Sequence, residues 1–155
     1  MSRRLDPRTL IWASLALQAV GFAIDAVWHG ALHPDFEAPA RAEMLAHLAS
    51  VHAVFLVGIL ALVASTAWGL WGAVTRSGDV PEFAVAFAAT LVQAAGQAWD
   101  LSGHLHQSHG PPISWAMIVG GPLVVAVTLW VSRARRRGRT SASGSPAEGR
   151  VASHR

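Results

Sequence analysis

The sequence has no cysteine and no lysine, and only 14% of its 155 residues are charged. Without cysteine the chain forms no disulfide, and metal handling by paired thiolates is disfavoured. Methionine is also scarce, with three residues, so a methionine-rich Cu(I) site is equally disfavoured. A soluble helical bundle would carry charged residues on every turn of its outer faces. The scarcity of charge therefore argues against a soluble all-α domain.

Hydrophobic residues make up 52% of the chain and gather in four long runs. These runs predict membrane-spanning helices over residues 10–28, 47–72, 83–101 and 113–132. Each run is close to the roughly 20 residues that cross the hydrocarbon core of a bilayer. We therefore expect an all-α integral membrane protein, in which four transmembrane helices form an antiparallel bundle.

Arginine supplies all the permanent positive charge, and 11 of the 12 arginines fall on one side of this four-helix topology. The positive-inside rule makes that side cytoplasmic and places both termini there. We expect a transmembrane domain over residues 1–135 and a disordered basic cytoplasmic tail over 136–155. The predicted location is the inner membrane of a bacterial-type cell. The arginines lie beside the membrane, which favours the lipid bilayer as partner over nucleic acid, and a chain this small often associates with itself or with larger membrane subunits.

Histidine and aspartate gather at the opposite, extracytoplasmic level of the predicted bundle. Seven of the eight histidines lie there, and so do the two carboxylates embedded in apolar runs. Ionisable groups at membrane depth are costly, so such a cluster indicates a functional site. The candidate metal ligands are Asp25, His29, His47, His52, Asp100 and His104, with His33, His106 and His109 as further candidates near the loops.

Residues 18–29 and 93–104 share the pattern Q-A-x-G-x-A-x-D-x-x-x-H at an offset of 75 residues. The two helices that carry the pattern run in the same direction, which predicts two parallel helix-pair repeats. Residues three and four apart share one face of a helix, so each copy presents a stripe of Gln, Gly, Asp and His. An Asp and a His one turn apart can bind one metal ion together, or the Asp can orient a His that binds it.

The two copies differ in what could complete a site. The second span runs antiparallel to the first, which puts His52 and His47 at the depths of Asp25 and His29. The fourth span contains no histidine. Loop histidines could complete a second site, or the second copy could join the first in one shared or dinuclear centre.

The stretch "DAVWHGALHPDFEAP", followed by a histidine on the next helix, resembles the metal-binding region of the C subunit of particulate methane and ammonia monooxygenases. The resemblance covers about 25 residues, and the loop before the later histidine is longer here than in that family. The matching positions are Asp25, Trp28, His29, Asp35, Phe36, Pro39 and His47 or His52. The resemblance implies that Asp25, His29 and one of the two later histidines bind copper on the extracytoplasmic side.

Histidine with carboxylate suits Cu(II), zinc or non-haem iron, and the resemblance ranks copper first. The chain would then be a redox or accessory membrane subunit. One alternative is an electron-transfer protein with b-type haem held by histidines of two helices, together with quinone. Another is a small transporter or a structural subunit without metal, although the inner halves of the second and fourth spans offer few polar groups.

Overall fold

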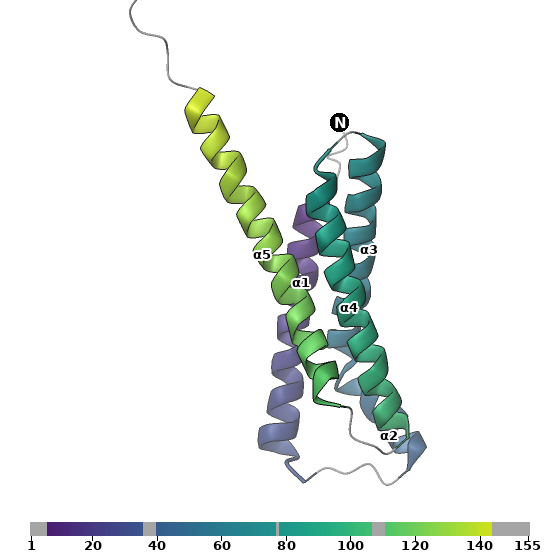
Figure 1. Cartoon of the computed structure of the whole chain (residues 1–155). Helices are drawn as coiled ribbons and strands as arrows, with labels where there is room; N and C mark the ends of the chain where they lie inside the picture. Colours follow the sequence, from purple (N-terminus) through teal and green to yellow (C-terminus); the bar gives the residue numbers. More distant parts are fainter. Residues whose placement is uncertain (1–5, 36–39, 77, 107–110, 144–155) are drawn as a thin grey trace, which may run out of the picture.

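The computed structural model describes residues 6–35, 40–76, 78–106 and 111–143. These residues are almost entirely helical and contain no strand, which confirms the all-α class. Successive long helices run in opposite directions, and the beginning of the first helix and the far end of the last helix lie toward the same end of the molecule (Figure 1).

Helix α1, Pro7–Val27, begins with a proline, whose missing amide hydrogen would have no partner in a first helical turn. The side chain of Asp6 caps this turn by accepting a hydrogen bond from the backbone N–H of Arg8, at 3.1 Å. At its other end α1 passes into a short π-helix, η1, at Trp28–Leu32.

The predicted second span is divided into two helices. The short helix α2, Arg41–Ser50, is followed by α3, Ala53–Thr75, and the chain bends at Val51 and His52 between them. The α2 segment "RAEMLAHLAS" is too polar to continue the apolar run of α3. The long apolar helix therefore starts at residue 53 and not at residue 47.

Helices α4, Val80–Leu105, and α5, Pro112–Ser143, complete the chain. Helix α5 continues through residues 136–143, which we had assigned to a disordered tail. Arginine, a good helix former, occupies positions 136, 137 and 139 of that segment. Residues 144–155, the rest of the expected tail, lie outside the described residues.

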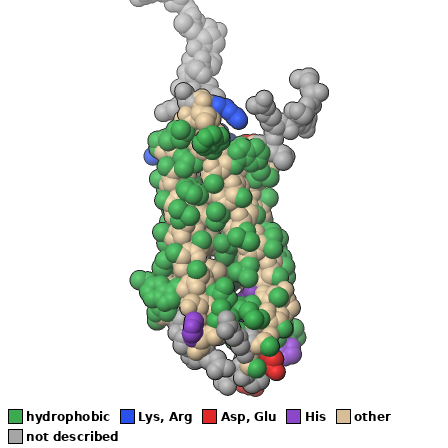
Figure 2. All heavy atoms as spheres, turned by 90° about the vertical axis from the view of Figure 1, so that its right-hand side faces the viewer, with side chains coloured by type: hydrophobic (Ala, Val, Ile, Leu, Met, Phe, Trp, Pro, Cys, Tyr) green, Lys and Arg blue, Asp and Glu red, His purple; other side chains and the backbone are tan. Residues whose placement is uncertain are grey.

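Three helical segments in the described part of the chain are long and apolar enough to cross a membrane: Pro7–Leu32, Ala53–Thr75 and Pro112–Gly138. They fit an integral membrane protein, and many large apolar side chains point outward, as with Trp71, which is 70% exposed. Figure 2 shows apolar side chains spread along the face in view, between the two ends of the molecule. Helix α4 has the length of a span, but it contains polar residues such as Gln93 and Gln97, and it is not among the three.

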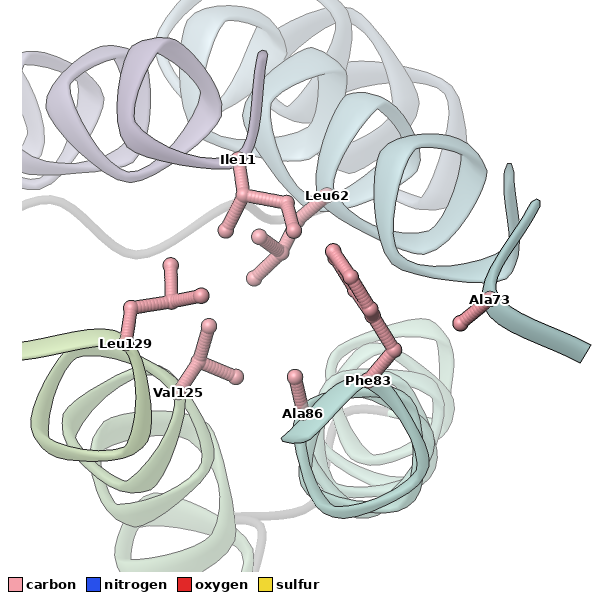
Figure 3. Packing of buried hydrophobic residues seen from close by; sticks show 7 residues of the cluster. All are labelled: Ile11, Leu62, Ala73, Phe83, Ala86, Val125 and Leu129. Atoms are coloured by element: carbon pink, nitrogen blue, oxygen red, sulfur yellow. The ribbon is translucent and has the colours of Figure 1, made fainter. Parts of the chain in front are cut away.

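The long helices pack in the spatial order α1, α3, α4, α5. Helix α1 lies along α3, α5 lies along α4, and α3 joins the two pairs by packing on α4, whereas α1 and α5 touch little. All four contribute to one buried apolar cluster, which is drawn in Figure 3 and consists of Ile11, Leu62, Ala73, Phe83, Ala86, Val125 and Leu129. Neighbouring helices therefore pack closely at the α1–α3, α3–α4 and α4–α5 contacts, whereas the bundle is comparatively open between α1 and α5.

A network of four charged side chains joins α1, α4 and α5 at one end of the molecule, which we call the arginine end. Arg8 donates to Glu82 at 2.9 Å and to Asp79 at 2.6 Å. Arg136 of α5 donates to the same two carboxylates, at 2.8 Å and 3.0 Å. The side chain of Glu82 is only 5% exposed, so that its charge depends on these two guanidinium groups.

We expect Glu82→Gln to lower the free energy of unfolding by about 2–3 kcal/mol. Removing one partner of a fully buried ion pair costs about 3–5 kcal/mol, and the partial exposure of both arginines reduces that figure. Denaturant unfolding of the detergent-purified chain measures the change. Asp79→Asn is the matched control, because Asp79 is 55% exposed and should contribute under about 1 kcal/mol. Equal stability of the two variants would contradict this account of the network.

Candidate metal centre

Three histidines from three different elements converge at the end opposite the arginine end, which we call the histidine end. His29 belongs to η1, His47 to α2, and His52 directly precedes α3. Their ligand nitrogens all lie within 4.8 Å of one another. The Nε2 atom of His47 is 3.2 Å from Nε2 of His29 and 3.1 Å from Nε2 of His52.

These separations are close to those that a shared metal ion requires. Imidazole nitrogens bind zinc at about 2.0–2.1 Å, and a tetrahedron with such bonds has edges of about 3.3–3.4 Å. The two measured Nε2–Nε2 distances, 3.2 Å and 3.1 Å, fall slightly below that edge. Moving the rings of His29 and His52 slightly away from His47 would bring these two distances to that edge, and the third pair of nitrogens lies within 4.8 Å.

The chemistry of the imidazole ring also favours a cation at this point. Each Nε2 has one position in the ring plane, which carries either a proton or a lone pair. Nε2 of His47 lies close to a nitrogen of His29 and to a nitrogen of His52. Its single proton or lone pair can form a good hydrogen bond with only one of these two nitrogens. Three neutral imidazoles that turn their lone pairs to one cation satisfy all three nitrogens together.

Local backbone features bring these histidines together. The N–H of His33 donates to the carbonyl of Trp28 at 2.8 Å, the five-residue spacing of a π-turn. Such π-segments often occur at functional sites, and this one carries His29. The bend at Val51 and His52 turns the chain between α2 and α3, so that His47 and His52 meet although they are five residues apart.

Asp25 lies beside two of the histidines, on the Nδ1 side of His52 and the Nε2 side of His29. Its Oδ1 atom is 3.0 Å from Nδ1 of His52 and 3.6 Å from Nε2 of His29. Oδ1 is buried, and among the described residues it has no partner with the geometry of a hydrogen bond, despite its short distance to His52. A carboxylate in this position can orient the imidazole of a ligand or bind the metal itself.

A glycine fixes the distance between α1 and α3 beside the centre. A Cβ atom on Gly21 would overlap the backbone and Cβ of Phe55 in α3. Small residues allow helices to approach this closely. Since Gly21 is one turn before Asp25 and Phe55 is three residues after His52, this contact holds the carboxylate within reach of the imidazole.

Trp28 packs against the centre in a way that sequence reasoning missed. Its ring lies 4.7 Å from the ring of His29, 4.4 Å from that of His47 and 4.4 Å from that of His33, measured between ring centroids. The sequence analysis named Trp28 only as one of the positions that match the metal-binding stretch of the resemblance. The adjacent Trp–His pair was the available signal. Trp28 restricts the orientation of the two ligand rings, whereas His33 is exposed on its outer side.

A cavity of about 410 Å³ adjoins the histidines and reaches the second half of the chain. Its polar lining residues are Asp25, His29, His52, Gln97, Asp100 and Trp115. Asp100 is 7% exposed and belongs to the wall formed by α4, outside the group of three histidines. The cavity therefore brings the two aspartates of the repeated pattern to one space, while the three converging imidazoles all come from the first half.

Of the remaining candidates in the second half, the structure describes the side chain of His106, which lies outside the converging group. His106 is exposed, and its Nδ1 lies 2.7 Å from the carbonyl oxygen of Ser102. The side chain of His104 and all of His109 lie outside the described residues. Deeper in the molecule, Gln93 donates to Gln18 at 2.6 Å, so the two glutamines of the repeated pattern meet directly.

Comparisons with protein-family models, with curated proteins and with solved structures found no match to this chain. The function is therefore argued from the site itself.

Proposed function

We propose that this chain is an integral membrane protein that binds one copper ion through His29, His47 and His52 on the extracytoplasmic side. The observation that carries the proposal is the convergence of three imidazole nitrogens within 4.8 Å. Asp25, at 3.0 Å from His52, supplies the negative charge and the orientation that a metal-binding imidazole commonly has behind it. The protein would serve as a redox or accessory membrane subunit.

Copper is favoured over the other metals for two reasons. Cu(II) binds nitrogen ligands more strongly than the other divalent metals of the first row, and no thiolate competes in this chain. The local resemblance to the monooxygenase C subunit, at Asp25 and His29, points to the same metal. A b-type haem held between His47 and His52 is disfavoured because their rings meet edge to face, with centroids 4.9 Å apart, which leaves no room for a porphyrin between them.

We propose further that the chain crosses the membrane four times and that both termini lie in the cytoplasm. Helix α4 packs between α3 and α5, both apolar enough to span, and its polar side chains Gln93 and Asp100 are buried and so avoid lipid. Arg8 and Arg136 belong to the arginine end, which the positive-inside rule would place in the cytoplasm. The histidine end would then face outward.

We also infer that the chain contains two helix-pair repeats, α1 with α3 and α4 with α5. Gly58 packs against Gln18, and Gly121 packs against Gln93 in the same way. Trp115 follows His52 in the sequence at the same separation at which Gly121 follows Gly58. Trp115 therefore has the position in the second helix pair that His52 has in the first. A tryptophan at the position equivalent to a ligand supports one metal site per chain and not two.

Metal analysis of the full-length chain tests the proposal. We expect the detergent-purified protein, stripped by a chelator and then given Cu(II), to retain one copper per chain after desalting. Electron paramagnetic resonance should show splitting from imidazole nitrogen. His106→Ala, an exposed histidine outside the group, is expected to retain the same copper. Folded protein that retains no copper, or purified protein with the Soret band of haem, would refute the assignment.

A further inference from the structure

An apolar groove runs between α1 and α5, where these two helices touch little. Its volume is about 380 Å³, and its walls include Trp12, Ala19 and Phe22 of α1 and Val119, Pro122 and Ala126 of α5. In the proposed membrane placement, this side of the protein faces the hydrocarbon core. A lipid-soluble molecule could therefore enter the groove sideways.

The groove and the cavity beside the histidines share part of their lining. Phe22, Phe55 and Ile118 line both spaces. A molecule that lies in the groove could thus extend past these three side chains to Asp25 and the histidines. Each space, at about 380 Å³ and 410 Å³, has the size of a pocket for a small organic ligand.

The two spaces differ in chemistry. The groove is lined almost entirely by apolar side chains, with Gln18 as an exception. The cavity ends at the carboxylate of Asp25, whose Oδ1 is buried and lies 3.0 Å from Nδ1 of His52 without the geometry of a hydrogen bond, and a carboxylate oxygen can accept from a further donor. An occupant that satisfies both must carry a hydrogen-bond donor at one end of an apolar body. An acyl chain would fill the groove but would bring no donor to Asp25.

We propose that the groove and cavity together bind a lipid-soluble phenol. Its hydroxyl group donates to Asp25, and its ring packs among Phe22, Phe55 and Trp115, where aromatic contacts favour a flat ring. Its alkyl part lies in the groove between α1 and α5. This proposal rests on the proposed membrane placement. The phenol would reach the metal site, but its binding does not require that the metal be bound.

Native mass spectrometry of the metal-free, full-length chain tests this with a matched pair of ligands, 4-octylphenol and octylbenzene. The two share the apolar body and differ in the hydroxyl group. We expect a saturable one-to-one adduct with the phenol and binding that is about 10-fold weaker or more for the hydrocarbon, because a hydrogen bond to a charged acceptor is lost. Equal binding of the two, or no adduct with either, would overturn the proposal.

A pair of variants locates the adduct. Ala19→Trp fills the groove and should abolish the phenol adduct. Val20→Trp is the control, because Val20 is 54% exposed and lies about 100° further round α1. Retention of the adduct by Ala19→Trp, or its loss in both variants when both remain folded by circular dichroism, would refute binding in the groove. Copper retention by the same preparations is a separate readout, so failure of the metal site is distinguished from failure of this site.

Discussion

Replacing His47 with alanine is expected to abolish stoichiometric copper binding, with an affinity at least about 100-fold below that of the unchanged chain. Loss of a residue that only orients a ligand already costs about 10–100-fold, and His47 is placed as a ligand. Its Nε2 is the neighbour common to the other two histidines, at 3.2 Å and 3.1 Å. Competition between the protein and a chromophoric copper chelator measures the affinity.

The matched control for His47→Ala is His33→Ala. Both rings pack on Trp28 at 4.4 Å between centroids, so both variants lose a contact with the same indole. His33, however, is exposed and outside the converging group. We expect His33→Ala to keep the affinity of the unchanged chain. A His47→Ala protein that folds and still binds one copper with unchanged affinity would remove His47 from the centre.

Asp25→Asn is expected to weaken copper binding about 10- to 100-fold, the usual effect of removing the group that orients a metal-binding imidazole. The substitution preserves the shape of the side chain but removes the negative charge 3.0 Å from Nδ1 of His52. The same chelator competition measures the effect. Asp79→Asn, at the arginine end, is the control for loss of one carboxylate and should bind copper as the unchanged chain does.

Asp100→Asn extends this experiment to the second half of the chain. Asp100 is as buried as a ligand would be, at 7% exposed, but it belongs to the α4 wall of the cavity and not to the converging group. We expect a much smaller effect than that of Asp25→Asn. Equal losses in the two variants would favour one centre shared between the halves, and would contradict a site built by the first half alone.

The sequence predicted the helical class and the end of the molecule where the site lies, because both depend on where apolar and ionisable residues occur along the chain. Asp25, His29, His47 and His52 were all candidate ligands, and they lie together. The π-turn at His29 and the bend before His52 were not predicted. Both depend on which carbonyl each backbone amide meets after packing, and hydrophobic periodicity carries no such information.

Other differences have equally physical causes. The run over residues 47–72 was treated as one span because its average hydropathy is high, although its first residues fold as part of the separate helix α2. The contacts of Trp28 with two histidine rings could not be predicted, because they depend on how η1 and α2 pack. The position of Asp100 could not be predicted, because it depends on how the two helix pairs associate.

The hydrogen bond from Gln93 to Gln18 has a consequence for the symmetry of the molecule. In an isologous arrangement, residues on the twofold axis meet their own equivalents, as these two glutamines of the proposed repeats do. In a single hydrogen bond between two glutamine side chains, one side chain is the donor and the other is the acceptor. The two glutamines therefore have different roles. Gln18 accepts from Gln93 and donates onward to the carbonyl of Gly58 at 3.1 Å, while Oε1 of Gln93 has no hydrogen bond among the described residues. In the proposed repeat, the direction of this hydrogen bond would therefore distinguish the two halves at their axis, about seven residues along α1 from Asp25.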